Sequence, residues 1–105
     1  MYARHVRVKL RSNSVREFRR LVANEIVPLL RNQKGFLDEI TLITYQRNEA
    51  IAISFWDNRD NADAYNHLGY LDVLRLLSRV VESMPIVETF EVADSTFHDI
   101  AAGAA

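Results

Sequence analysis

The segment that most constrains the fold is residues 50–57, AIAISFWD, which is apolar on both of its faces. Alternate side chains of an extended strand point in opposite directions. One face therefore holds Ile51, Ile53 and Phe55, and the other holds Ala52, Ser54 and Trp56. A strand that is apolar on both sides lies between two layers, so the sheet that contains it needs a cover on each face.

The hydrophobic pattern predicts three further strands and a first helical region. Residues 2–10 and 86–97 alternate as half-buried strands do, and a tight turn at residues 47–49 joins a strand at residues 36–46 to residues 50–57. Apolar residues at helical spacing follow Ser14, which forms the pattern of a capping box with Glu17. Pro28 is expected to loosen the last turns of this helix, which stops at Gly35.

A second helical region fills the interval before the last strand, which gives the order β-α-β-β-α-β. This region begins at a cap formed by Asp57 or Asn58, is interrupted near Gly69 and ends at Pro85. The order is that of the split βαβ or ferredoxin-like α+β fold, whose four-stranded antiparallel sheet carries helices on one face. No further element remains to cover the other face, so the sequence predicts a homodimer. We assign residues 1–98 to one domain and residues 99–105 to a flexible tail.

Composition and motifs exclude several classes of protein. Hydrophobic residues make up 49% of the chain and charged residues 26%, which is usual for a soluble globular domain. No apolar run could cross a membrane, and the start is too charged for a signal peptide, so we expect a cytoplasmic protein without a membrane partner. Without cysteine there is no disulfide, thiolate nucleophile or cysteine-bound zinc. Glycine-rich phosphate loops are missing, and His5, His67 and His98 fall on separate elements, so no cofactor and no metal are expected.

Charge is distributed unevenly along the chain. Residues 1–34 hold nine of the thirteen Lys and Arg residues but only two of the fourteen acids. This basic third could steer an anionic ligand, or face the acidic remainder across the fold or a subunit contact. The sequence KGF is similar to part of an RNA-recognition strand, yet it opens the second strand rather than the third, and Asp38 and Glu39 follow it. These acids repel phosphates and the first strand offers no aromatic for base stacking, so no nucleic-acid partner is expected.

Aromatic and amide side chains gather in the sequence just after the strand at residues 50–57: Trp56, Tyr65, Asn66, His67 and Tyr70. The small side chains that share a face with Trp56 leave room beside it. A void lined by Trp and Tyr would suit a flat aromatic or quinone-like ligand. In the other interpretation, Trp56 and Tyr70 fill that room as ordinary core.

Three segments carry a resemblance to the antibiotic biosynthesis monooxygenase domain, a family of dimeric α/β barrels. They are IVPLLRNQKGFLDEITL, AISFWDNRDNADAY and PIVETFEVADSTFH, and the resemblance extends over about residues 2–98. It implies a homodimer whose sheets pack face to face. It also implies a range of activities: some members oxidise aromatic phenols with oxygen and no metal or flavin, others cleave haem, and many have no known activity.

Individual positions separate these branches. Trp56 matches the tryptophan that lines the pocket of active members. The asparagine of the haem-degrading branch falls near Val6 and its haem-ligating histidine near Arg75, and both positions differ from the family pattern. The aromatic-oxidising branch uses Asn, Trp, Tyr and Arg, for which Asn66, Tyr65 and Arg75 are nearby candidates.

The sequence therefore supports a cofactor-independent monooxygenase that acts on a small aromatic or quinol. We expect Trp56, Asn66 and Arg75 to bind the substrate, and the candidates for catalysis are His67, Tyr65 and Tyr70. The absence of a clear acid–base pair favours the alternative, a non-catalytic barrel that binds a small molecule or is purely structural. In either case Trp56 is predicted to be buried on the helix-facing side of its strand, beside a pocket shared with the second helical region.

Overall fold

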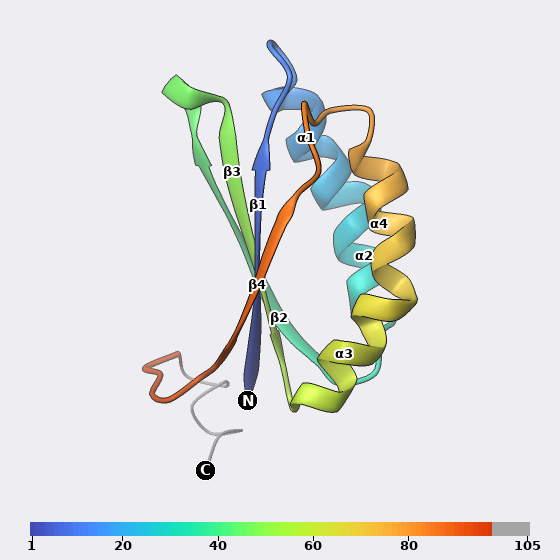
Figure 1. Cartoon of the computed structure of the whole chain (residues 1–105), viewed down its shortest axis with the longest axis vertical. Helices are drawn as coiled ribbons and strands as arrows, with labels where there is room; N and C mark the ends of the chain where they lie inside the picture. Colours follow the sequence, from blue (N-terminus) through green and yellow to red (C-terminus); the bar gives the residue numbers. More distant parts are fainter. Residues whose placement is uncertain (98–105) are drawn as a thin grey trace.

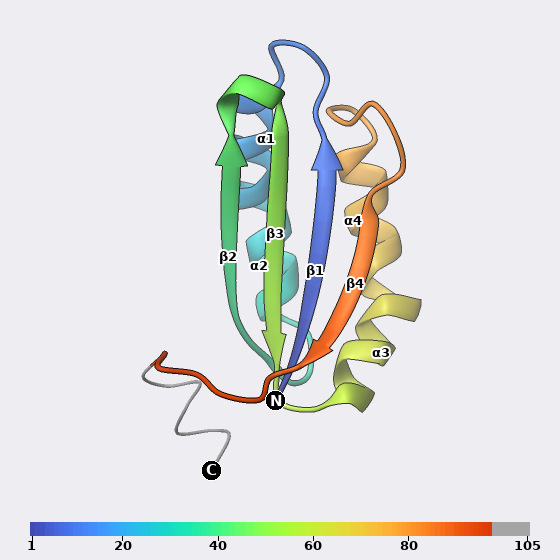
Figure 2. The same cartoon turned by 60° about the vertical axis from the view of Figure 1, so that its left-hand side comes forward.

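Helices cover one face of a four-stranded antiparallel sheet in the computed structural model, which describes residues 1–97 (Figures 1 and 2). The strands lie in the order β2-β3-β1-β4, and every neighbouring pair is antiparallel. This arrangement confirms the predicted α+β, ferredoxin-like fold. Residues 99–105, assigned to a tail, lie outside the described residues. The elements in chain order are β1 (Tyr2–Lys9), α1 (Val15–Leu21), η1 (Val22–Ile26), α2 (Val27–Arg31), β2 (Phe36–Thr44), η2 (Tyr45–Arg47), β3 (Glu49–Trp56), α3 (Arg59–His67), α4 (Gly69–Leu77) and β4 (Ile86–Glu91).

The two faces of β3 have the environments that its alternation predicts. Trp56 is 0% exposed, and Ser54 on the same face is also buried. The Trp56 ring stacks on Tyr65 of α3, with ring centroids 4.9 Å apart, so this face is the helix-facing one. Ile53 and its alternate neighbours lie on the face that no helix covers in Figure 1. The prediction for Trp56 is confirmed in burial and in direction.

The first helical region is continuous but changes its winding before Pro28. The helix α1 passes into the π-helix η1, and Pro28 lies in the first turn of α2. A proline lacks an N–H, and a locally wider turn accommodates the missing bond, which confirms the predicted loosening. The predicted capping box is wrong, because the Ser14 side chain makes no cap hydrogen bond. Its backbone, at φ −103° and ψ 0°, is not in the extended conformation that a side-chain cap requires.

The second helical region and the last strand are both shorter than predicted. The helix α4 ends at Leu77, because the residues that follow it turn toward the segment just after β1. Val81 forms a β-bridge with Leu10, and the Arg11 backbone N–H donates to the Val80 carbonyl at 2.8 Å. This tertiary pairing overrides the helical period. Strand β4 ends at Glu91, which pairs with Tyr2 at the start of the neighbouring strand β1.

Two local features, the Asn58 cap and the turn at Gly35, shape the end of the molecule near Trp56, and the cap is as predicted. The Asn58 side chain caps α3 by accepting a hydrogen bond from the Asn61 N–H at 2.9 Å. The helix α2 ends at Arg31, four residues before the predicted stop at Gly35, and Gly35 lies in the turn that leads into β2 with φ +82°, where a side chain would collide with Asp57 and Asn61. The Asp57 N–H donates to the Gly35 carbonyl at 2.9 Å, which ties the start of β2 to the end of β3.

Candidate functional site

A cavity of about 50 Å³ lies between the helix-facing side of the sheet and the helices. Much of its wall is apolar, with side chains from β1, η1, α2 and α4. Polar groups enter it from five elements: Arg4 of β1, Glu39 of β2, Ser54 of β3, Tyr65 of α3 and Tyr70 of α4. Pockets that combine an apolar wall with a few convergent polar groups are the usual form of a small-molecule site.

Arg4 is a buried cation at the centre of this group. Arg4 points toward the helices because it lies on the same face of β1 as Val6 and Val8, at alternate positions along the strand, and it is only 2% exposed. Its Nη2 donates to Asn66 Oδ1 at 2.7 Å. Burial lowers the pKa of Arg4, but a guanidinium keeps its charge in proteins. The site therefore holds a positive charge in a largely dry environment.

Aromatic rings provide most of the remaining support for this charge. The guanidinium carbon lies 5.0 Å from the centroid of Tyr65 and 4.3 Å from that of Tyr70, both within cation–π range. Burial raises the pKa of both tyrosines, so their hydroxyl groups stay protonated near neutral pH. The ring of Tyr65 also stacks on Trp56.

Two buried polar groups in the cavity wall have no partner at full hydrogen-bond geometry within residues 1–97. They are the Nε–H of Arg4 and the hydroxyl of Tyr70. Burial raises the pKa of Tyr70, although the Arg4 side chain lies close enough to the Tyr70 hydroxyl to act against that effect and lower the pKa. A buried donor left unpaired costs about 1–3 kcal/mol, and more when it is charged, so folded proteins rarely retain one without a reason. Both groups can donate, and a ligand with an acceptor oxygen would satisfy them together.

Trp56 supports the site from behind rather than lining it. Its Nε1 donates to Ser54 Oγ at 2.9 Å, its edge meets Phe36 at a centroid distance of 5.6 Å, and its face packs on Tyr65. The indole is thus fully paired and packed on several sides. The cavity wall next to it is Tyr65, whose ring Trp56 holds in place.

A carboxylate, Glu39, enters the cavity from the neighbouring strand. The sheet register pairs Glu39 with Ser54, and Ser54 with Arg4, so the three lie in one row across β2, β3 and β1. Thr41 Oγ1 donates to the Glu39 carboxylate, at 2.9 Å from Oε1 and 2.6 Å from Oε2. Burial raises the pKa of Glu39, the Thr41 hydrogen bond lowers it, and the charge of Asp38 raises it again.

The structure brings together only some of the residues that the sequence singled out. Tyr65 and Tyr70 line the cavity, and Asn66 is exposed but contacts it through Arg4. His67 is exposed at the end of α3, because two residues beyond Tyr65 a helix presents its opposite side. Arg75 is also exposed, with its Nη1 3.4 Å from Asp72 Oδ1. The geometry therefore places neither His67 nor Arg75 in the cavity wall.

Sequence reasoning missed Arg4 and Glu39, although the alternation along the strand contained a signal for Arg4. Arg4 shares the inward face of β1 with Val6 and Val8. The corresponding pattern in β2 is interrupted, since the register shifts between Phe36 and Asp38. Because of this bulge, counting alternate positions along β2 from Phe36 does not predict that the Glu39 side chain faces inward.

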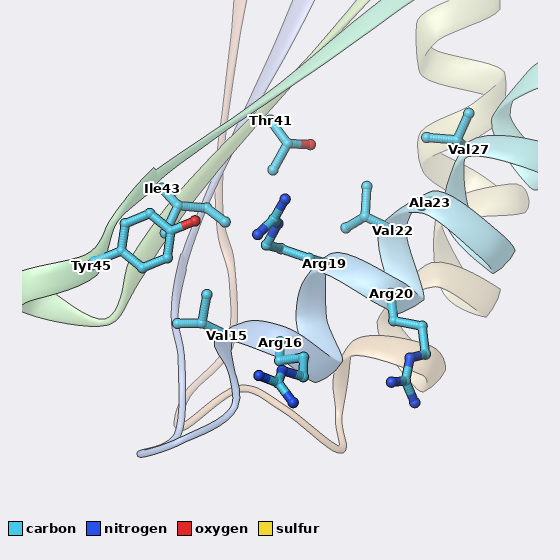
Figure 3. A pocket seen from close by; sticks show the side chains of 10 residues that line it. All are labelled: Val15, Arg16, Arg19, Arg20, Val22, Ala23, Val27, Thr41, Ile43 and Tyr45. Carbon is cyan, nitrogen blue, oxygen red and sulfur yellow. The ribbon is translucent and has the colours of Figure 1, made fainter.

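A larger groove of about 750 Å³ adjoins the cavity along β2 (Figure 3). Figure 3 shows Arg19 and Thr41 pointing into it, with Ile43 and Tyr45 on the strand side. Val22 of η1 lines both the groove and the cavity, so it lies between them. The exposed rim arginines of the groove belong to the basic first third of the chain, and they give the groove a positive field.

Two other kinds of site can be assessed from the described residues. Within residues 1–97 no group of three His, Asp or Glu side chains is arranged to hold a metal ion. None of the helices in that part of the chain is long and apolar enough to cross a membrane.

The fold and the cavity together define a ferredoxin-like α+β domain with an aromatic, arginine-containing pocket between its sheet and its helices. The chain belongs to the antibiotic biosynthesis monooxygenase family, whose profile matches residues 1–85. No curated protein sequence matches it.

Solved structures with the same fold cover nearly the whole chain. SnoaB from Streptomyces nogalater, a cofactor-independent oxygenase, is 17% identical with a TM-score of 0.74, covering 91% of this chain and 96% of its own. A protein of unknown function from Nitrosomonas europaea is 15% identical with a TM-score of 0.75, over 91% of this chain and 92% of that one. A Mycobacterium tuberculosis protein is 17% identical with a TM-score of 0.70, over 90% and 97%. At these identities the likeness concerns the fold.

Proposed function

We propose that the protein is a cofactor-independent monooxygenase that binds a small phenol or quinol in the cavity around Arg4. The observation that carries this proposal is the pair of unpaired buried donors, Arg4 Nε–H and the Tyr70 hydroxyl, beside stacked aromatic rings. A phenolate oxygen accepts from both, and an aromatic ring complements the tyrosines. Family membership and the likeness to SnoaB support the reaction class.

Such a reaction needs little chemistry from the protein. A phenol with a free ring carbon and one O₂ give a quinone and one water, so the four electrons that reduce oxygen all come from the substrate. Deprotonation makes the ring electron-rich enough to react with oxygen, and the protein has to favour the phenolate and exclude bulk water. Arg4 favours the phenolate because a positive charge in a dry site stabilises an adjacent oxyanion.

The cavity volume sets a condition on this function. Ligand pockets usually measure about 300–1,000 Å³, whereas the cavity holds about 50 Å³. Binding therefore requires the wall to move, and the adjoining groove of about 750 Å³ supplies the space on the far side of Val22. A π-helical turn at this point is consistent with a movable wall, since such turns are frequent at functional sites.

We also propose that a second copy of the chain covers the open face of the sheet. Large apolar side chains stand exposed on this face in three strands: Ile40 and Leu42 of β2, Ile86 and Phe90 of β4, and the half-buried Ile51, Ile53 and Phe55 of β3. An apolar sheet face packs well on another such face. The proposed unit is accordingly a homodimer with a separate cavity on the helix side of each subunit.

Oxygen consumption by a panel of anthrones, naphthoquinols and flavonols tests the activity. We expect the anthrones to give the anthraquinone and one water with one O₂ consumed per substrate, and a loss of at least about 100-fold in that rate in Arg4→Met, as for removal of an oxyanion donor. Arg79→Met, which removes an exposed arginine outside the cavity wall, is the matched control and should keep its rate.

The same panel distinguishes the alternative function. A compound that raises the melting temperature but is recovered unchanged would identify a non-catalytic binding domain. If no member of the panel is bound or oxidised, the proposal for an aromatic substrate is wrong.

A further inference from the structure

We infer that Glu39 is the general base that removes the substrate's phenolic proton, and that Arg4 receives the resulting oxyanion at the other end of the same row. This inference rests on the proposed function, because it names the group that carries out its first step. The sequence showed no acid–base pair, and the sheet register supplies one: Glu39, Ser54 and Arg4 occupy directly paired positions on three adjacent strands.

The spacing of the row leaves room for a substrate. Neighbouring strands lie about 4.8 Å apart, so the backbones at Glu39 and Arg4 are roughly 10 Å apart, with the small Ser54 between them. Opposite charges that share a buried cavity usually pair with each other. Here Arg4 turns to Asn66 and the tyrosines, and Glu39 is held by Thr41. The two charged ends thus stay separated on either side of the cavity floor.

Glu39 also has a path for the proton to leave. Besides the cavity, it lines a surface hollow of about 400 Å³ together with Asp38 and Arg31. A general base must return its proton to solvent after each turnover, and a residue that faces both the cavity and the surface can do so. No other carboxylate among the described residues lines the cavity.

The charges around Glu39 suit this role. Burial raises the pKa of Glu39 toward the range in which a carboxylate can exchange a proton with a phenol, and Asp38 on its own strand acts in the same direction. The groups that face it from other elements are Arg31 of α2, Arg4 of β1, and the protonated hydroxyls of Tyr65 and Tyr70. The hydrogen bond from Thr41 favours the carboxylate form and so opposes the effect of burial on the pKa of Glu39.

The proposed step conserves atoms and charge. The phenolic O–H bond breaks, its proton moves to the Glu39 carboxylate, and its electron pair stays on the phenolate oxygen. That oxygen then accepts hydrogen bonds from Arg4 Nε–H and the Tyr70 hydroxyl, the two donors that lack partners. The negative charge moves from one end of the row to the other, where the guanidinium stabilises it.

Binding of 4-nitrophenol, whose phenolate has its own absorption band, tests the step without turnover. At a pH where the free compound is neutral, we expect the wild-type protein to bind it and show the phenolate band, without releasing a proton to a weakly buffered solution. Glu39→Gln should still bind it, as shown by a raised melting temperature, but without the band. Asp38→Asn, the matched control on the neighbouring residue, should keep the band because Asp38 does not line the cavity.

A phenolate band that persists in Glu39→Gln would overturn the role of Glu39. The pH profile of oxygen consumption gives an independent check: Glu39→Gln should lose about 10²–10⁴-fold in rate together with its acid limb. Asp38→Asn should keep its rate, with the limb displaced to lower pH because the charge that raises the pKa of Glu39 is removed. If 4-nitrophenol ionises on binding but no quinol consumes oxygen, the proton transfer to Glu39 is supported and the oxygenase function is wrong. If a quinol consumes oxygen but 4-nitrophenol does not ionise on binding, the oxygenase function is supported and the role of Glu39 is wrong.

Discussion

Replacing Arg4 with Met is expected to stabilise the folded protein while it removes oxyanion binding. The charge of Arg4 gains one hydrogen bond to Asn66, worth about 1.5–3 kcal/mol for a charged donor. Its cation–π contacts add about 2 kcal/mol. Against this stands a desolvation cost of several kcal/mol for a buried ion, and the lowered pKa of Arg4 shows that burial disfavours its charged form.

Met would remove that cost and retain most of the packing. Its side chain can follow the path of the arginine stem, and burying it contributes about 1.5–3 kcal/mol. The Asn66 side chain is exposed and regains water as its partner. We therefore expect the free energy of unfolding to rise by about 1–3 kcal/mol, within the roughly 1–4 kcal/mol found when buried ion pairs are replaced by apolar residues. The melting temperature of a domain of this size would rise by roughly 5–20 °C.

Urea denaturation at one fixed protein concentration measures the change, because dimer dissociation would otherwise alter the apparent stability. Arg79→Met is the control, and an exposed substitution of this kind should stay within about 0.5 kcal/mol of the wild type. A loss of stability of more than about 1 kcal/mol in Arg4→Met would show that Arg4 holds the fold together, and the argument that a ligand compensates its burial would fail.

Three further changes test other parts of the structure. Trp56→Phe should cost about 1–3 kcal/mol in urea denaturation, because it leaves a small void and removes the hydrogen bond to Ser54, and it should change ligand affinity through the loosened Tyr65. Since the pKa of Glu39 is raised in the folded state, the contribution of Glu39 to stability should be largest below its ordinary pKa of 4.5 and fall as the pH rises through the folded value. Glu39→Gln should abolish that part of the pH dependence, and an unchanged profile would contradict it. Ile53→Lys should give a monomer in sedimentation at micromolar concentration, because it places an unpaired charge in the proposed contact.

The fold was predictable because its main signals are local. The two apolar faces of residues 50–57 required a layer on each side, and the structure has helices on the side of Trp56. The loosening before Pro28 and the interruption near Gly69 were also correct, since both depend on the backbone chemistry of single residues. The predicted helix past Leu77 failed for the opposite reason. Val80 and Val81 are bonded to Arg11 and Leu10, and a pairing across some 70 residues leaves no periodic trace.

The candidate site was harder to predict because its central residues contradict the expectation for their positions. A charged side chain in an amphipathic strand is normally taken as solvent-facing, since burying a charge is expensive. Arg4 is nevertheless buried, and its hydrogen-bond partner Asn66 lies 62 residues away. Glu39 likewise faces inward on a strand whose register a bulge has shifted.

This contradiction is itself informative about function. The neighbours of Arg4 satisfy only part of its hydrogen-bonding capacity, and we expect the fold to be more stable with an apolar residue in its place. A site that holds a charge at a cost to stability is understandable when a bound oxyanion supplies the missing interaction. In a single sequence of this kind, the signal to look for is therefore a charged residue at a strand position that alternation assigns to the buried face. Arg4 is such a residue, because it alternates in step with the inward-facing Val6 and Val8.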